Sequence, residues 1–154
     1  MKDKISFVGS GNVAFHLANA FDLAGYKIHQ IISRNEVTGN ELASKFAAYF
    51  NNCIEDILND ADFIFLTIPD KSISDIANKI NAESSVIVHC AGSGSIGLIA
   101  ESKTNAAVLY PLQTFSKNRK LDYFKIPVFI EASNLETFRK IRDLAESISN
   151  IVIE

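Results

Sequence analysis

An α/β fold, with a doubly wound and mostly parallel sheet in a three-layer α/β/α arrangement, is predicted by three observations. Strand-like and helix-like segments alternate along the chain, which is the order that parallel βαβ units require. Residues 62–68 are almost wholly apolar, as expected for a strand that helices cover on both faces. Residues 5–14 pass from an apolar run through Gly-x-Gly-x-x-Ala into a helical pattern, the order in which a dinucleotide-binding unit begins.

The first half of the chain predicts two strand–helix units and the strand of a third. The apolar run at 4–8 is a strand, and the helix expected at 12–24 has apolar residues at helical spacing before Gly25, namely Val13, Leu17, Ala18 and Phe21. Strand 27–32 precedes a helix at 36–47, whose apolar residues are Val37, Leu42, Ala43 and Phe46. We expect a short strand at 48–50, a brief helix at 54–58 and the apolar strand at 62–68.

The second half continues the alternation with one irregular segment. We expect a helix at 72–80, a strand at 85–89, a short helix at 95–102 and a strand at 106–110. Residues 112–125 have no clear period. A strand at 127–131 precedes a helix at 134–148 and a final strand at 151–153, and the apolar face of that helix is Leu135, Phe138, Ile141, Leu144 and Ile148. No composition shift marks a linker, so residues 1–154 are expected to form one domain.

Composition and charge exclude several classes of protein. A net charge of −3 argues against a nucleic-acid partner, whose usual footprint is strongly basic. The apolar runs are too short for a membrane helix, and the N-terminus enters the first strand without an apolar signal region. Cys53 and Cys90 lie far apart and form no metal-ligand spacing. We therefore expect a cytoplasmic protein with reduced cysteines, no metal site and a small-molecule substrate.

The glycine turn is the candidate site for a dinucleotide. Gly9 allows a tight turn, Gly11 lets the backbone approach a pyrophosphate, and Ala14 lets the helix sit close to the strand. The helix N-terminus then offers free N–H groups and the positive end of its dipole to the phosphates. The alternative is a tight turn with no ligand. The cofactor contacts expected here are Gly9, Ser10, Gly11, Asn12 and Val13.

The residues after the second strand favour NADP over NAD. An NAD-binding unit usually ends this strand with a carboxylate that accepts from the ribose 2′-hydroxyl, whereas this chain has Ser33, Arg34 and Asn35. A guanidinium suits a phosphate, and without an acid nothing repels the 2′-phosphate. We therefore expect Ser33, Arg34 and Asn35 to bind this phosphate. The alternative is a solvated arginine that caps the next helix.

Two further turns should lie beneath the cofactor, because ligands of open α/β sheets bind beyond the carboxyl ends of the strands. Ile68, Pro69 and Asp70 follow one strand, and the alternative there is a proline turn in which Asp70 or Ser72 caps a helix. Small residues follow the next strand, and we expect Ala91 and Gly92 to leave room near a nicotinamide.

Histidines and the irregular segment supply the remaining candidates. His89 is either a general acid or base at the cleft rim or a buried, satisfied histidine. His16 and His29 are expected to be structural or exposed to solvent. Residues 112–125, with their polar and basic side chains, form either a solvated loop or a substrate-side loop that attracts a carboxylate or phosphate.

Five motifs occur in an order that resembles a known group of enzymes: Gly-x-Gly-x-x-Ala, Ser33-Arg34, Thr67-Ile-Pro-Asp70, His89-Cys-Ala-Gly92-Ser and Tyr110-Pro-Leu-Gln-Thr-Phe-Ser116. Together they resemble the Rossmann-like NADP-binding half of oxidoreductases related to pyrroline-5-carboxylate reductase and to coenzyme F420-dependent NADP oxidoreductases. The wider 6-phosphogluconate and β-hydroxyacid dehydrogenase group is similar too. Many relatives have His-Pro where this chain has Tyr110-Pro111, although Tyr110 keeps a hydroxyl.

The resemblance implies an NADP-dependent reductase or dehydrogenase, with residues 1–154 as its cofactor domain and His89 and Tyr110 as candidate proton donors. It also implies a helical domain after this one, absent from these residues, that builds a dimer and part of the substrate pocket. Apolar surface left by that domain should drive self-association, and the candidates are Leu112, Phe115, Tyr123 and Phe124. The alternative function is an NADP-sensing module without catalytic activity.

Overall fold

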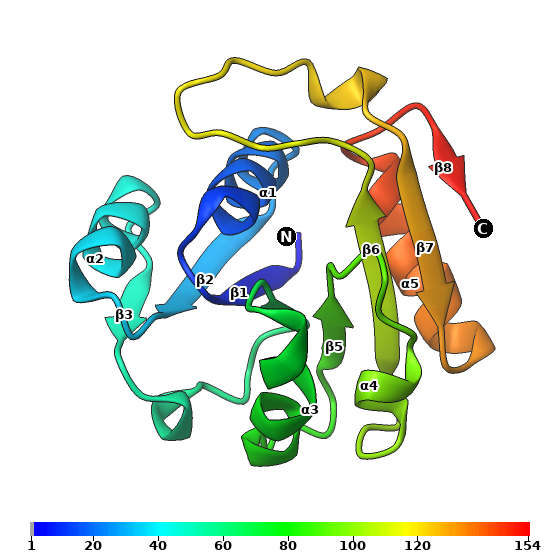
Figure 1. Ribbon diagram of the computed structural model, residues 1–154, viewed down its shortest axis with the longest axis horizontal. Helices are drawn as coiled ribbons and strands as arrows, with labels where there is room; N and C mark the ends of the chain where they lie inside the picture. The colour runs from blue at the N-terminus through cyan, green and yellow to red at the C-terminus, as the bar shows by residue number, and fades with distance from the viewer. Residues whose placement is uncertain (1) are drawn as a thin grey trace.

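The computed structural model describes residues 2–154, which fold around one eight-stranded sheet (Figure 1). The strands are β1 (Lys4–Val8), β2 (Lys27–Ile32), β3 (Tyr49–Asn51), β4 (Phe63–Leu66), β5 (Val86–His89), β6 (Ala106–Pro111), β7 (Val128–Ala132) and β8 (Val152–Ile153). The α-helices are α1 (Asn12–Leu23), α2 (Glu36–Lys45), α3 (Asp70–Lys79), α4 (Gly97–Ala100) and α5 (Leu135–Glu146). Two short 3₁₀ helices are η1 (Ile54–Asp56) and η2 (Tyr123–Lys125).

The strand order is β3-β2-β1-β4-β5-β6-β7-β8. Adjacent strands run parallel, except that β6 and β7 are antiparallel. Because the chain crosses from β3 back to β4 beside β1, the order reverses between β1 and β4, and ligands of such sheets bind at this switch point. The predicted doubly wound, mostly parallel sheet is confirmed.

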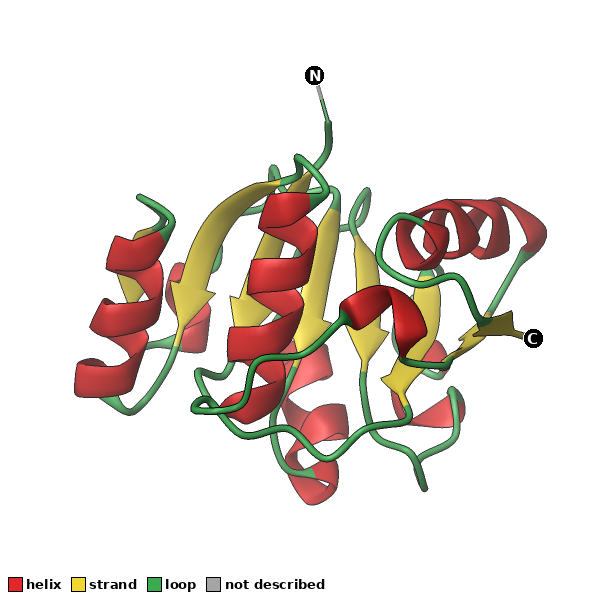
Figure 2. Ribbon diagram, turned by 90° about the horizontal axis from the view of Figure 1, so that it is seen from above, coloured by secondary structure: helices red, strands yellow, loops and turns green. Residues whose placement is uncertain are grey.

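Helices cover both faces of the sheet, as Figure 2 shows. One apolar cluster joins the sheet to α1, α2 and α5, and the other joins it to η1, α3 and α4. Ala14 is fully buried in the first cluster, so α1 can lie close to the strands, as predicted. Phe65 stacks on Phe7 with ring centroids 5.3 Å apart and lies at the same distance from Phe21 of α1. The core therefore fixes α1 directly over β1 and β4.

Element boundaries differ from the predictions mainly at helix ends. The helix expected at 72–80 starts at Asp70, with Pro69 as its N-cap residue. The alternative in which the side chain of Asp70 or Ser72 caps this helix is wrong, because no side chain caps it. Asp70 lies inside the first turn, where its negative charge interacts favourably with the helix dipole. The helix expected at 95–102 is only α4, and η2 forms within the segment that shows no period. No helix within residues 2–154 has the length and apolar character to cross a membrane.

Candidate functional site

A cleft of about 1200 Å³ opens at the carboxyl ends of β1, β2 and β4, beside the switch point of the sheet. Nine of the predicted cofactor residues line it, namely Gly9, Ser10, Gly11, Asn12, Ser33, Arg34, Asn35, Ile68 and Pro69. Further lining side chains include Thr38, Asn52, Cys53, Glu55, Thr67, Ser72, Asp75, Lys79 and Lys117. The sheet therefore brings most of the predicted site into one cavity.

The glycine turn owes its shape to Gly9. This residue has a φ of +110°, which side chains other than glycine rarely tolerate. A Cβ at this position would overlap the carbonyl oxygen of Thr67 at the end of β4. The Gly9 amide donates to the carbonyl of Ile32 at 2.7 Å. The turn is thereby held between β4 and β2.

The start of α1 is open toward the cleft. A Cβ at Gly11 would meet no atom within 4 Å. Gly11 is the N-cap residue, no side chain caps the helix, and its first turn contains no acid. By contrast, Asn35 caps α2 and Asn134 caps α5 through hydrogen bonds to backbone amides. The free amides and positive dipole end of α1 thus suit a pyrophosphate, for which the space at Gly11 leaves room.

Three hydroxyls tie the glycine turn to the next βα unit. The Ser10 hydroxyl lies 2.6 Å from that of Ser33 and 2.7 Å from that of Thr38 in α2. Ser10 and Ser33 are buried. The Ser33 side chain is therefore engaged inside the protein, where it helps to orient the end of β2. Thr38 was missed in the sequence because a single threonine in a helix carries no local signal.

Arg34 is the free cation at the end of β2. Its side chain forms no ion pair among residues 2–154. The residue itself is exposed, and it lines the cleft. The carboxamide of its neighbour Asn35 accepts from the Thr38 amide at 3.1 Å. Asn35 rather than Arg34 therefore caps α2, which leaves the guanidinium available to a phosphate.

The predicted residues Val13, Asp70, Ala91 and Gly92 lie outside the lining of this cleft. Val13 packs against the core. Asp70 accepts a hydrogen bond of 3.1 Å from the Ser93 hydroxyl, which joins the start of α3 to the turn after β5. Ala91 and Gly92 belong to that turn, on the half of the sheet where a nicotinamide is expected.

His89 is fully buried at the end of β5. Its Nδ1 accepts from the Ala91 amide at 3.1 Å, and its Nε2 lies 2.9 Å from the Ser95 carbonyl. Since a carbonyl only accepts, Nε2 carries the proton. Burial lowers the pKa of His89, although the hydrogen bond to Ser95 partly opposes this effect. With Nδ1 as acceptor and Nε2 as donor, the hydrogen bonds fit the neutral ring, which orders the turn after β5.

Tyr110, the other candidate proton donor, is half-buried in β6. Its ring lies so close to the Gly92 backbone that a Cβ at Gly92 would overlap it. The ring centroid is 6.5 Å from that of Phe129 in β7. Tyr110 and His89 therefore flank the same turn, His89 from beneath and Tyr110 from the neighbouring strand.

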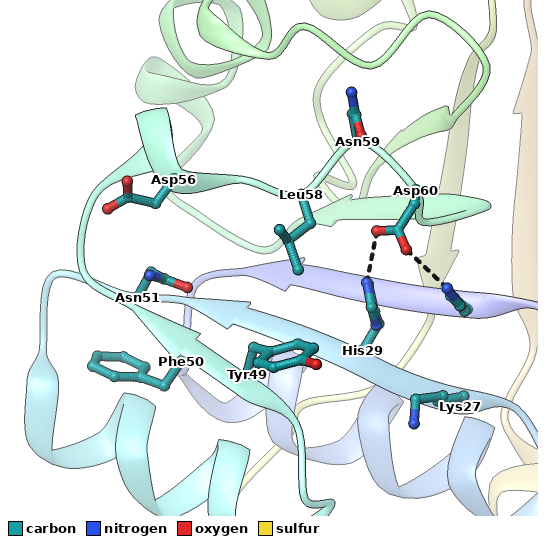
Figure 3. A pocket seen from close by; sticks show the side chains of 10 residues that line it. Lys27, His29, Tyr49, Phe50, Asn51, Asp56, Leu58, Asn59 and Asp60 are labelled. Atoms are coloured by element: carbon teal, nitrogen blue, oxygen red, sulfur yellow. Dashed lines mark hydrogen bonds and ion pairs between the residues drawn. The ribbon is translucent and has the colours of Figure 1, made fainter.

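A second cavity, of about 930 Å³, lies beside the amino ends of β1 and β2, away from the glycine turn (Figure 3). Asp60 bridges Lys4 and His29 there, with both N···O distances at 2.8 Å. The hydrogen bonds from Lys4 and then His29 lower the pKa of Asp60 to about 2. His29 is buried, and its Nδ1 has no partner among residues 2–154. This cluster joins β1, β2 and the loop before β4, which is a structural role.

Among residues 2–154, no group of three or more histidine, cysteine or carboxylate side chains is arranged to hold a metal ion.

Comparison with known proteins agrees with the geometry of the cleft. The sequence pattern of the family described as NADP oxidoreductase, coenzyme F420-dependent, matches residues 4–92, more than half of the chain. The chain belongs to this family. The matched residues run from β1 to the turn after β5, so they include the glycine turn and the end of β2. No curated protein matches the chain.

Solved structures have the same fold. A "putative NADP oxidoreductase" from Bacteroides fragilis is 32% identical with a TM-score of 0.90, and the alignment covers 98% of this chain and 60% of that one. Pyrroline-5-carboxylate reductase from Streptococcus pyogenes is 14% identical with a TM-score of 0.76, and the alignment covers 99% and 58%. Prephenate dehydrogenase from A. aeolicus is 16% identical with a TM-score of 0.80, and the alignment covers 99% and 59%.

Membership of this family confirms two predictions from the sequence: the cofactor NADP and the resemblance of the five motifs to NADP-dependent oxidoreductases. The chain therefore contains a domain of the family described as NADP oxidoreductase, coenzyme F420-dependent, whose pattern spans residues 4–92. The chain spans about 60% of the length of these solved relatives.

Proposed function

We propose that this domain binds NADP(H) for an oxidoreductase that transfers hydride to or from a small-molecule substrate. The observation that carries the proposal is the open start of α1: no side chain caps it, no acid lies in its first turn, and the space at Gly11 is free. Such a helix end binds phosphate groups well. When bound, the cofactor supplies or accepts the hydride.

The residues of the cleft divide the binding task. The first-turn amides of α1 would hold the pyrophosphate, and Arg34 would hold the 2′-phosphate in a charge-assisted, bidentate contact. Ile68 and Pro69 would form the wall beneath the ribose. The turn after β5 would take the nicotinamide half, with His89 as a positioning residue beneath it. Tyr110 is half-buried and carries a hydroxyl, so it is our candidate proton donor.

An NADP-sensing module without catalysis is the second candidate function. Both ring nitrogens of His89 are engaged by backbone groups of one turn, which favours this candidate because it removes one of the two proposed proton donors. The two functions share the cofactor site and differ only in turnover.

Titration with NADPH and NADH tests the proposed cofactor site. A hydrogen bond to a charged group contributes about 1.5–3 kcal/mol, so wild-type protein should bind NADPH at least tenfold more tightly than NADH. Arg34→Ala should abolish most of this preference. Arg139→Ala is the matched control, because Arg139 is exposed on α5, outside the cleft. Equal affinities of wild-type protein for the two cofactors in calorimetry would refute the assignment.

A further inference from the structure

The loop after β6 reaches back to the glycine turn. In Figure 1 it runs from β6 past the end of α1 before it returns to β7. Lys117 of this loop lines the cleft, and its Nζ donates to the carbonyl of Ser10 at 3.2 Å. Ser10 lies between the two glycines of the turn. The loop thus places an ammonium group at the open end of α1.

His16 of α1 holds this loop in place. Its Nε2 donates to the carbonyl of Ser116 at 2.6 Å, and its Nδ1 lies 3.0 Å from the Tyr123 hydroxyl. The imidazole stacks on Phe115, with centroids 5.0 Å apart and planes 19° apart. His16 is almost completely buried by these contacts. We call the arrangement of His16, Phe115, Ser116 and Tyr123 the His16 clamp.

The hydrogen bond to Ser10 uses one of three donors on the Lys117 ammonium. Because Lys117 lines the cleft, where the first amides of α1 are also free, its other two donors are available to a ligand there. A carbonyl oxygen carries only a partial charge, whereas a pyrophosphate carries full negative charge and forms stronger, charge-assisted hydrogen bonds. The neighbouring basic residues Arg119 and Lys120 are exposed and do not line the cleft. Of these three basic residues, Lys117 is therefore the one whose side chain lies in the cleft.

We propose that Lys117 binds the cofactor's pyrophosphate and that the His16 clamp positions it there. The inference rests on the proposed function, since it requires NADP(H) at the glycine turn. It assigns a contact from the β6–β7 loop, beyond residues 4–92 to which the family pattern extends. Lys117 would thus act on the phosphates shared by NADPH and NADH, whereas Arg34 acts on the 2′-phosphate of NADPH alone.

The first experiment measures the affinities of wild-type protein, Lys117→Met and Lys120→Met for NADPH and NADH. Lys117→Met should weaken the binding of NADPH and of NADH by the same factor, because the contact is to a phosphate group that both share. We expect a factor of about ten, which corresponds to the loss of about 1.4 kcal/mol. Lys120→Met, the matched control, should bind like wild type. Raising the salt concentration should shrink the difference between wild type and Lys117→Met, because salt screens partly exposed charges.

The possible results separate the two proposals. Wild-type protein that binds neither cofactor would overturn both the proposed function and the Lys117 contact. Wild-type binding with an unchanged Lys117→Met variant would overturn only the Lys117 contact. A loss restricted to NADPH would assign Lys117 to the 2′-phosphate and overturn the pyrophosphate assignment.

A double-mutant cycle tests the positioning role of His16. His16→Phe keeps an aromatic ring but loses both hydrogen bonds of the clamp, so it should weaken NADPH binding. In the Lys117→Met background the same substitution should have no further effect, because interacting residues are non-additive. His16→Gln, which can still donate to the Ser116 carbonyl, should restore binding. If His16→Phe weakens NADPH binding equally in wild-type protein and in Lys117→Met, the positioning role is overturned. Thermal unfolding checks that each variant compared is folded.

Discussion

His89 binds two backbone groups of one turn and is shielded from solvent, so its ionisation should affect stability. Its pKa lies below the ordinary value of 6.5 because burial disfavours the charged ring. As the pH falls below 6.5, the unfolded chain takes up this proton before the folded chain does. The free energy of unfolding should therefore decrease below pH 6.5, and the decrease should end once the folded ring is protonated too.

Nuclear magnetic resonance checks this prediction directly. The ring of His89 should titrate below 6.5 and should carry its proton on Nε2 in the neutral form. In urea unfolding, His89→Gln should show a smaller loss of stability between pH 7.5 and 5.5 than wild type. A ring that is protonated at pH 7, or a proton on Nδ1, would contradict the hydrogen bonds described for the turn after β5.

The two glycines of the turn between β1 and α1 should respond differently to substitution. Gly11→Val should leave the fold intact, because a Cβ there meets no neighbouring atom, and should abolish NADPH binding by filling the space proposed for the pyrophosphate. Gly9→Ala should instead destabilise the protein, because its φ is +110° and its Cβ would overlap the Thr67 carbonyl. Thermal unfolding combined with NADPH titration separates the two effects. Normal NADPH binding by Gly11→Val would place the phosphates elsewhere.

The elements with strong local patterns could be predicted from the sequence, and those held by distant contacts could not. The apolar β4 and the glycine turn followed by α1 are local features, and both are found where expected. Residues 112–125 have no period that predicts an element, and in the structure they are held to α1 by the hydrogen bond from His16 to the Ser116 carbonyl. Thr38 and Asn52 reach the cleft only through the packing of α2 and β3 beside β2.

The prediction of an exposed apolar surface is wrong for two of its four side chains, because a distant element covers them. Phe115 and Tyr123 pack around His16 and are half-buried. Leu112 and Phe124 are exposed, with 53% and 51% of their surface accessible. An apolar side chain in an irregular loop does not indicate by itself whether another element covers it.

Self-association remains a prediction for the whole molecule. The exposed apolar residues Leu112, Phe124, Phe129, Ile151 and Ile153 lie on or beside β7 and β8 at the edge of the sheet. Exposed apolar patches drive pairing, so light scattering should detect dimers as the concentration rises. The double variant Leu112→Lys with Phe124→Lys should reduce pairing. Leu23→Lys, at the exposed end of α1, is the control, and a monomer at all concentrations would contradict the prediction.

Catalytic turnover by residues 1–154 alone should be slow or absent. Holding a substrate against the cofactor contributes on the order of 7–11 kcal/mol of barrier reduction in favourable cases. The cleft offers walls from β1, β2 and β4, and we expect a helical domain of the kind implied by the resemblance to supply the wall that holds the substrate. NADPH oxidation with small carbonyl and imine compounds should stay near background while NADPH still binds. Rapid oxidation that Tyr110→Phe abolishes would show that this domain is catalytic unaided.

The His16 clamp also has a kinetic consequence for how the chain folds. His16 lies 100 positions before Ser116 and 107 positions before Tyr123 in the sequence, and Lys117 lies 107 positions after Ser10. Contacts between such distant positions require large loops to close, so they form slowly. During synthesis on the ribosome, β1 and α1 emerge long before residues 112–125. Until those residues are made, the side of α1 that carries His16 stays uncovered. The glycine turn is therefore among the first segments to be made and among the last to reach its final surroundings.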